Sequence, residues 1–298
     1  MTTRHPSQWH LIGQSVRGAS HVRSGLPNQD AILWGPESGI GPPLIVALSD
    51  GHGSSKSFRS HLGSALAVES IVELLREFVD LLEQGSKSLT AIKRTAEERL
   101  PQELVRRWQT AVDSHLLAHP FTPEELACLA RDRGEQASDE VLEHPRLAYG
   151  ATLLTVLATD AFLLFLQLGD GDILLVAETG EVTRPLTRDP RLIANETTSL
   201  CTERAWQEVR LCFRARHGDP PALIIIATDG YANSFINEDA FLKVGSDLLE
   251  ILQTEGVVWV EENLPSWLEE ASAMGSGDDI TLGILLRVDE ETRARHSA

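Results

Sequence analysis

Hydrophobic and polar positions divide this chain into blocks of two kinds. From residue 9 to about 50, short apolar runs such as WHLIGQSV, DAILW and LIVALS are separated by turns rich in glycine and proline, which predicts strands. From 55 to about 145, apolar residues recur at helical spacing instead, and Gly85 is the expected stop of the first helix. The chain therefore begins with strands and continues with a long helical block.

Within the helical block, a second helix is predicted over residues 89–119, with a kink or break at Pro101. A shorter helix is expected to begin at Thr122, because a proline and then an acidic residue follow it. The polar stretch 131–146 is predicted to be a loop. We expect the segment 86–146 as a whole to be a helical insertion on the surface, and the alternative is a platform for a substrate or a partner.

Apolar runs of strand length return after Gly150. ATLLTVLAT, AFLLFLQLG, DILLVAETGEVT, WQEVRLCF, ALIIIATD and ITLGILLRV predict strands, and residues 238–256 and 257–273 predict two amphipathic helices. Strands and helices occur in separate runs, which favours antiparallel sheets flanked by helices over regular βαβ units. Strands that are apolar at almost every position are typical of sheets buried on both faces. We expect one domain over 1–298.

The amino-acid composition limits the binding partners and the cellular compartment that are expected for this chain. The 298 residues are 42% hydrophobic and 23% charged, and the formal net charge is −18. So acidic a chain is a poor partner for nucleic acid or an anionic membrane. The three cysteines are odd in number and form no CxxC pair, so no disulfide framework is indicated. Without a signal-peptide pattern at the N-terminus or an apolar run of membrane length, a cytoplasmic protein is expected.

Acidic residues follow or precede the predicted strands at five places. They are Asp50, Asp170 and Asp229, which each follow an apolar run, and Asp30 and Asp278, which precede one. Strand ends can bring side chains from distant parts of a sequence to one point. Carboxylates gathered in this way repel one another unless cations neutralise them, and oxygen ligands suit Mg²⁺ or Mn²⁺. The sequence therefore predicts a carboxylate-rich metal centre.

Six motifs carry a resemblance to a known family. They are GASHVRSGLPNQDA, IVALSDGHGS, GATLLTVL, LQLGDGDILLV, IIIATDGYANSF and GSGDDITLGILL. Each is weak alone, but their order and spacing resemble the metal-dependent protein serine/threonine phosphatases of type 2C, in a bacterial-type form. The resemblance implies an α+β fold, a four-layer α-β-β-α sandwich with two central antiparallel sheets. It also implies two Mn²⁺ or Mg²⁺ ions and a weaker third.

The resemblance assigns roles to the acidic residues. Asp50 matches the carboxylate that bridges both metals, and Gly51 matches the residue that offers its backbone carbonyl. Asp229 and Asp278 match the remaining ligands of one metal. Asp30 matches an acid beside the cluster.

Two further residues complete the implied centre. Asp170 matches an acid that helps to hold the third metal, although an aspartate before a glycine is also a common turn pair. His52 matches a histidine proposed to protonate the leaving oxygen, a task that suits its ordinary pKa. The alternative for His52 is that it caps or orients a loop.

Several positions depart from the family pattern. The usual acid before Asp30 is Gln29, and the phosphate-binding arginine is replaced by Gly25. Arg23 and His21 are the candidates for phosphate binding instead. Asn233 stands where many members have an acid for the third metal. In the DD pair, Asp279 competes with Asp278 as a ligand.

The resemblance also predicts the function. We expect hydrolysis of phosphoserine or phosphothreonine in proteins by a water activated by two metals, in a signalling circuit that opposes a Ser/Thr kinase. A monomer is expected, with a flap at about 185–205 beside the active site. Two alternatives stay open: a catalytically impaired phosphatase-like binding module, and a hydrolase of a small phosphorylated metabolite.

Overall fold

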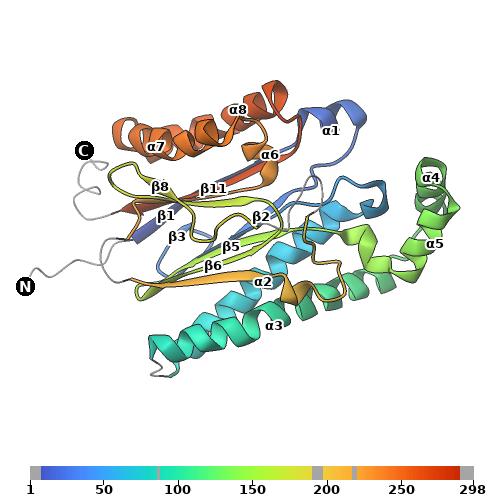
Figure 1. The fold of residues 1–298 in the computed structure, drawn as a ribbon, viewed down its shortest axis with the longest axis horizontal. Coiled ribbons are helices and arrows are strands. Elements are labelled where there is room, and N and C mark those ends of the chain that lie inside the picture. Colours follow the sequence, from blue (N-terminus) through green and yellow to red (C-terminus); the bar gives the residue numbers. More distant parts are fainter. Residues whose placement is uncertain (1–7, 86–87, 190–196, 217–219, 289–298) are drawn as a thin grey trace, which may run out of the picture.

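The computed structural model describes residues 8–85, 88–189, 197–216 and 220–288. Two antiparallel sheets lie face to face at the centre, and helices cover the outer face of each, so the molecule has four layers (Figure 1). The predicted α-β-β-α sandwich is therefore observed. No helix in these ranges is long and apolar enough to cross a membrane.

The first sheet has six strands in the order β3-β1-β11-β10-β7-β8. Its strands are β1 (Gln8–Val16), β3 (Ile40–Gly41), β7 (Asp172–Val176), β8 (Val182–Thr183), β10 (Leu223–Ala227) and β11 (Ile280–Val288). The first and last long strands pair along their whole length, from Gln8 opposite Val288 to Val16 opposite Ile280. The two ends of the described chain thus lie side by side in the sheet.

The second sheet has five strands in the order β2-β4-β5-β6-β9. Its strands are β2 (Ala31–Gly35), β4 (Leu44–Ser49), β5 (Leu153–Ala158), β6 (Phe162–Leu168) and β9 (Arg210–Ala215). The predicted strand WQEVRLCF is shorter than expected, because its first residues form the 3₁₀ turn η3 (Ala205–Gln207). Trp9, Leu48, Phe165 and Ile226 are among the apolar side chains buried in the cluster that the two sheets share.

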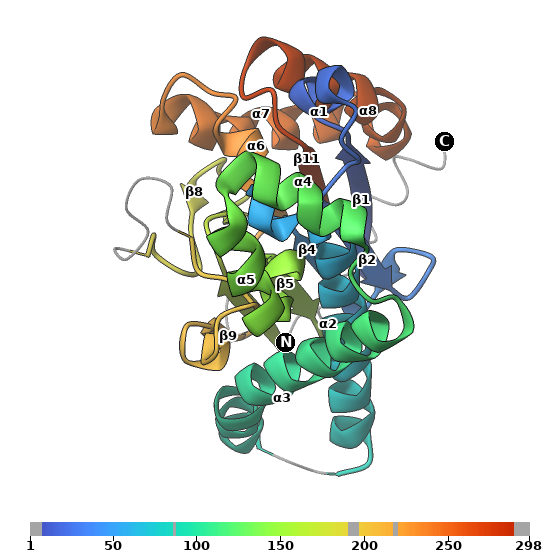
Figure 2. The ribbon, with the colours of Figure 1, turned by 90° about the vertical axis from the view of Figure 1, so that its right-hand side faces the viewer.

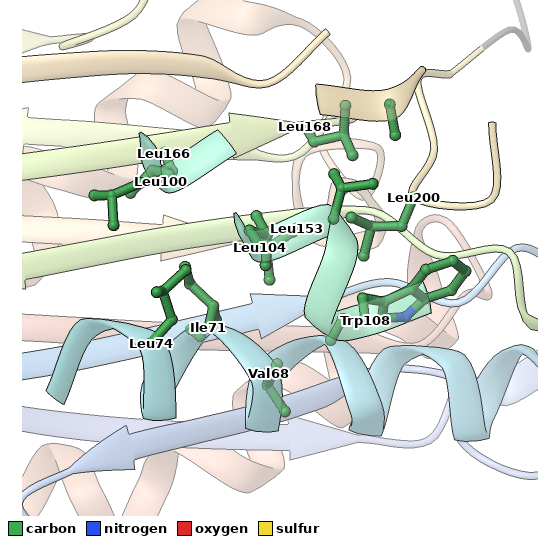
Figure 3. Packing of buried hydrophobic residues seen from close by; sticks show 14 of the residues in the cluster. Val68, Ile71, Leu74, Leu100, Leu104, Trp108, Leu153, Leu166, Leu168 and Leu200 are labelled. Atoms are coloured by element: carbon green, nitrogen blue, oxygen red, sulfur yellow. The ribbon is translucent and has the colours of Figure 1, made fainter. Parts of the chain in front are cut away.

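Two long helices cover the second sheet. They are α2 (Ser60–Glu83) and α3 (Leu89–Ala118). Val68 and Ile71 of α2 pack with Leu104 and Trp108 of α3 against strand residues such as Leu153 (Figure 3). Part of the segment expected as a surface insertion thus contributes to a buried core. The indole of Trp108 also donates to the carbonyl of Gly63, at 3.0 Å.

Of the kink or break expected at Pro101, the break does not occur, because residues 89–118 form one uninterrupted helix. A proline inside a helix costs about 3 kcal/mol, through a lost hydrogen bond and a steric clash. Leu100 and Leu104 on either side are buried. We attribute the continuity of the helix to this packing, which offsets the local cost.

The expected loop at 131–146 is wrong. Helix α4 (Pro123–Arg133) begins at Thr122 with a capping box, as predicted, and is followed by α5 (Glu135–Glu143) and the 3₁₀ turn η2 (Pro145–Tyr149). Helix α5 is short and polar, with an apolar stripe of only Ala137 and Val141 buried among the core residues. Contacts with distant residues, not local propensity, stabilise it.

The first sheet is covered by α7 (Glu238–Thr254) and α8 (Val257–Met274), as predicted. Two short helices, α1 (Ala19–Ser24) and α6 (Asp229–Ala232), were not anticipated. Figure 2 looks onto the end of the sandwich where α1 and α6 lie on one side and α4 and α5 on the other. The predicted acidic residues gather at this end.

Candidate active site

Strand direction places the acidic residues at one end of the sandwich. Pairing registers place the ends of β4 and β6 with the start of β2, and the end of β10 with the start of β11. Asp50, Asp170 and Asp229 follow β4, β6 and β10, while Asp30 and Asp278 precede β2 and β11. The convergence predicted from the sequence is therefore observed.

The segment that carries Asp50 is held along its backbone. The carbonyl of Asp50 accepts from the N–H of Thr152 at 2.8 Å, and its N–H donates to the Thr152 hydroxyl at 3.1 Å. The N–H of His52 donates to the carbonyl of Gly150 at 3.0 Å. Gly51 lies between them, where a Cβ atom would be only 2.6 Å from the carbonyl oxygen of Gln29. Glycine is required here by this close approach.

Asp30 is anchored by two hydroxyl groups. Thr228 and Thr281 both donate to its Oδ2, each at 2.7 Å. Burial nevertheless raises the pKa of Asp30 well above its usual value, and the nearby charges of Asp279 and Asp229 raise it further. The threonines were not anticipated. Their signal in the sequence is a threonine directly before Asp229 in ATDG and another two residues after Asp279 in DDIT.

Asp50 and Asp229 lie close enough together for each to affect the pKa of the other. Burial raises the pKa of Asp50 well above its usual value, and the charges of Asp30 and Asp229 add to this effect. The pKa of Asp229 is also raised, first by burial and then by the charges of Asp170 and Asp278. Asn233 donates to Oδ2 of Asp229 at 2.9 Å. Without cations, these carboxyl groups do not all ionise together.

The two adjacent aspartates before β11 have different surroundings. The side chain of Asp279 is 3% exposed, and that of Asp278 is 52% exposed. Oδ1 of Asp279 accepts from the N–H of Gly18, and Oδ2 accepts from the N–H of Gln29, both at 2.6 Å. Both oxygens of Asp279 thus bind the chain itself, whereas Asp278 is available on the open side.

The phosphate-binding candidates lie on α1. Nδ1 of His21 is 2.9 Å from Oδ2 of Asp279, and its Nε2 is 4.0 Å from Oδ1 of Asp278. His21, Asp278 and Asp279 could together place three ligand atoms on one cation. Arg23 is exposed, with its guanidinium beside Gly277. His21 is thus the more deeply placed of the two candidates.

His52 lies beside the cluster and is largely enclosed. Burial lowers the pKa of His52, and the charge of Asp170 acts in the opposite direction. A Cβ atom on Gly150 would lie 2.5 Å from Cδ2 of His52 and 3.4 Å from Sγ of Cys201. His52 therefore shares its surroundings with Cys201, in the segment expected to form a flap.

Residues 190–196 of the expected flap lie outside the described residues. The parts that follow are at the acidic end of the sandwich. The hydroxyl of Thr198 accepts from the N–H of Gly169 at 2.8 Å, directly before Asp170. The N–H of Leu200 donates to the carbonyl of Ala151 at 3.0 Å. This segment is thus fixed beside the strand ends that carry the site.

The donor set fits divalent cations. Asp50, Asp229 and Asp278 supply carboxylate oxygens, and the pKa of each is raised first by burial and then by the charges of neighbouring aspartates. Divalent cations would remove this mutual repulsion, and oxygen-rich sites of this kind are typical of Mg²⁺ and Mn²⁺. The residues present therefore fit such ions.

Comparisons with known proteins agree with this geometry. A family model described as "Protein phosphatase 2C" matches residues 17–269. Comparison with curated proteins gave no match. The fold and the match together define a protein serine/threonine phosphatase. Since the match covers most of its length, the chain belongs to the protein phosphatase 2C family, as the motifs predicted.

Solved structures share the fold. The catalytic domain of the serine/threonine protein phosphatase PstP, in complex with two manganese ions, is 20% identical, with a TM-score of 0.55 over 95% of this chain and 100% of that one. PppA, a regulatory component of T6SS in Pseudomonas aeruginosa, is 18% identical, with a TM-score of 0.53 over 94% and 98%. Stp1 from Staphylococcus aureus is 12% identical, with a TM-score of 0.54 over 97% and 98%. At these identities, the likeness concerns the fold.

Proposed function

We propose that this protein hydrolyses phosphoserine and phosphothreonine in proteins, with Mn²⁺ or Mg²⁺ bound at the carboxylate end of the sandwich. The gathering of Asp50, Asp229 and Asp278 at one end of the sandwich carries the proposal, because bound divalent cations would let these mutually repelling carboxyl groups all ionise. The manganese ions in the PstP structure support the same ligand chemistry.

Within this proposal, Asp50 and the Gly51 carbonyl hold the cations at the end of β4, and Asp229 and Asp278 complete the site from the other sheet. Asp30 accepts hydrogen bonds from two threonines and lies near Asp50. Bound divalent ions lower the pKa of water and neutralise phosphate charge. Asp170 borders the space where a third, weaker ion would bind.

The remaining residues act on the substrate. His52 is proposed to donate a proton to the leaving serine or threonine oxygen. His21 and Arg23 are proposed to face the phosphate from α1, in place of the missing arginine at Gly25. The described part of the flap at Thr198 lies beside the site and is proposed to contribute to the choice of protein substrate.

The expected circuit is one in which this enzyme reverses the work of a Ser/Thr kinase in the cytoplasm. Family membership supports a phosphoprotein substrate, and the net charge of −18 supports a partner other than nucleic acid. We expect the enzyme to act as a monomer.

The test is a comparison of substrates and metals. The purified protein is assayed on phosphoserine and phosphothreonine peptides, sugar phosphates and nucleotides, with Mn²⁺, with Mg²⁺ and after chelation. Turnover of the phosphopeptides that requires added metal is expected. Faster turnover of a sugar phosphate would favour a metabolite hydrolase, and binding of phosphopeptides without turnover would indicate an impaired module.

A further inference from the structure

A cavity of about 250 Å³ lies on the side of the sandwich, along the outer edge of β1. Its floor is Leu11–Gln14 of β1. One wall is formed by Trp34 and residues 37–39, and the other by Glu261 and Leu264 of α8. None of these residues is part of the proposed active site, so the proposed phosphatase activity does not explain the cavity.

The edge of β1 is only partly paired. Strand β3 covers it at Trp9 and His10, and the N–H of Leu11 then donates to the carbonyl of Gly39 at 2.8 Å. Backbone groups alternate sides along a strand, so Gly13 and Ser15 direct their N–H and C=O groups to the same edge as Leu11. The amide side chain of Gln14 donates to the carbonyl of Ser15. Among the described residues, no backbone hydrogen bond reaches Gly13 from this side.

The cavity walls are suited to a cation. Glu37 and Glu261 both border it, and Trp34, which also lines it, donates through its indole Nε1 to the carbonyl of Glu37 at 3.3 Å. Nε2 of His10 is 3.6 Å from Oε1 of Glu261, which is longer than a hydrogen bond. No described cation forms an ion pair with Glu37. Two carboxylates beside an indole can bind a guanidinium or ammonium group through charge and cation–π attraction.

We propose that this edge is a docking site for an extended segment of a partner protein that carries an arginine or lysine. The segment would pair with β1 at Gly13, in the manner of an added strand, while its basic side chain enters the cavity between Glu37 and Glu261. Main-chain pairing supplies affinity without sequence preference, and the carboxylates supply the preference for a basic residue. The proposal does not depend on the phosphatase activity.

The experiment follows the amide signal of Gly13 in the ¹⁵N-labelled full-length protein. The probe is the blocked peptide acetyl-Thr-Val-Arg-Val-Thr-amide, with the same peptide carrying Gln in place of Arg as its matched control. Saturable movement of the Gly13 signal is expected with the arginine peptide, with binding at least fivefold weaker for the glutamine peptide. Equal binding of the two peptides, or no movement at millimolar concentration, would overturn the proposal.

Variants test the carboxylates. Glu37→Gln and Glu261→Gln should each weaken the binding of the arginine peptide about two- to fivefold, the usual range for the loss of an exposed ion pair. Glu262→Gln, an exposed neighbour on α8, is the matched control and should change binding by less than twofold. If Glu262→Gln weakens binding as much as Glu261→Gln, the attraction is a general effect of negative charge and the cavity is not the site.

Backbone pairing is tested on the peptide, which leaves the protein unchanged. Two versions of the peptide are N-methylated at alternate amides, one version at the first set and the other at the second. Each version therefore loses the N–H groups along one edge of the added strand. One should bind like the parent peptide and the other about tenfold more weakly. Equal affinity of both versions would exclude strand pairing. Hydrolysis of p-nitrophenyl phosphate by the Glu261→Gln variant should equal that of the unmodified protein.

Discussion

Nδ1 of His21 lies 2.9 Å from Oδ2 of Asp279, although 258 residues separate the two in the chain. The same carboxylate binds the N–H groups of Gly18 and Gln29. Asp279 therefore joins α1, the start of β2 and the start of β11 at the edge of the metal-binding end. Asp278, its neighbour in sequence, has no such role and faces outward.

This contrast predicts opposite effects for the two aspartates. Asp279→Asn should lower the free energy of unfolding by about 1–3 kcal/mol, since the amide nitrogen would face backbone donors in a buried place. Asp278→Asn should abolish metal-dependent turnover and leave stability without metal nearly unchanged. Urea unfolding after chelation and turnover with Mn²⁺ give the two values. The reverse pattern would show that Asp279 is the ligand.

Asp50→Asn should remove activity and change the response to metal. The substitution takes one charge from a group of repelling carboxylates, so the metal-free protein should melt at the same or a higher temperature. Added Mn²⁺ should raise the melting temperature of the unmodified protein, as any ligand of the folded state does. It should raise that of the variant much less. Full turnover by a folded Asp50→Asn protein would end the two-metal proposal.

His52→Ala should discriminate between substrates. A general acid is typically worth about 10²–10⁴-fold in rate, and it matters most for a basic leaving group. Hydrolysis of a phosphoserine peptide should therefore fall far more than hydrolysis of p-nitrophenyl phosphate, whose leaving group departs unaided. His61→Ala, at another partly buried histidine, is the control and should affect both substrates alike. Equal loss on both substrates for His52→Ala would make His52 a positioning residue.

The ion pair between Arg59 and Glu125 predicts a pH dependence of stability. Nε and Nη2 of Arg59 donate to the two oxygens of Glu125 at 2.7 and 2.8 Å, and Nη1 donates to Tyr149 at 2.8 Å. The hydrogen bonds from Arg59 hold the pKa of Glu125 below its usual value. The pair therefore stabilises the fold above the unfolded pKa of about 4.3, and this contribution is lost as pH falls through the lower folded pKa.

Glu125→Gln should accordingly lower the free energy of unfolding by about 1–3 kcal/mol at pH 7, because it leaves the Arg59 charge poorly compensated. The difference from the unmodified protein should shrink as the pH approaches 3. Urea unfolding across this range measures it. Glu124→Gln, on the same turn, should differ little from the unmodified protein at any pH. A difference for Glu125→Gln that does not change with pH would contradict the argument.

The sequence predicts which acidic residues lie together better than it predicts which other residues bind them and hold them in place. Asp50 and Asp229 could be placed because a strand end followed by a glycine is a local pattern, and the pairing of strands then fixes their position. The roles of Asp279 and Thr228 could not be predicted, because they depend on which groups from distant segments meet them. In a DD pair, nothing local tells the buried residue from the exposed one.

The same limit explains the errors in the helical block. Residues 135–143 have little apolar character, and their helix depends on contacts with distant residues, through Ala137 and Val141 in the buried core. Pro101 is a helix breaker by local rules, yet its neighbours Leu100 and Leu104 are buried in the core. In both cases, tertiary packing overrides the structure that the local sequence favours.

The pairing of β1 with β11 has a consequence for synthesis on the ribosome. Because β11 follows all the other described strands in the chain, β1 lacks this partner until those strands have been made. Asp278, a proposed metal ligand, lies just before β11, so the nascent chain lacks the full set of proposed ligands until then. A polypeptide that is released before β11 is made thus keeps an open sheet edge and, under the proposed function, lacks a ligand that turnover requires.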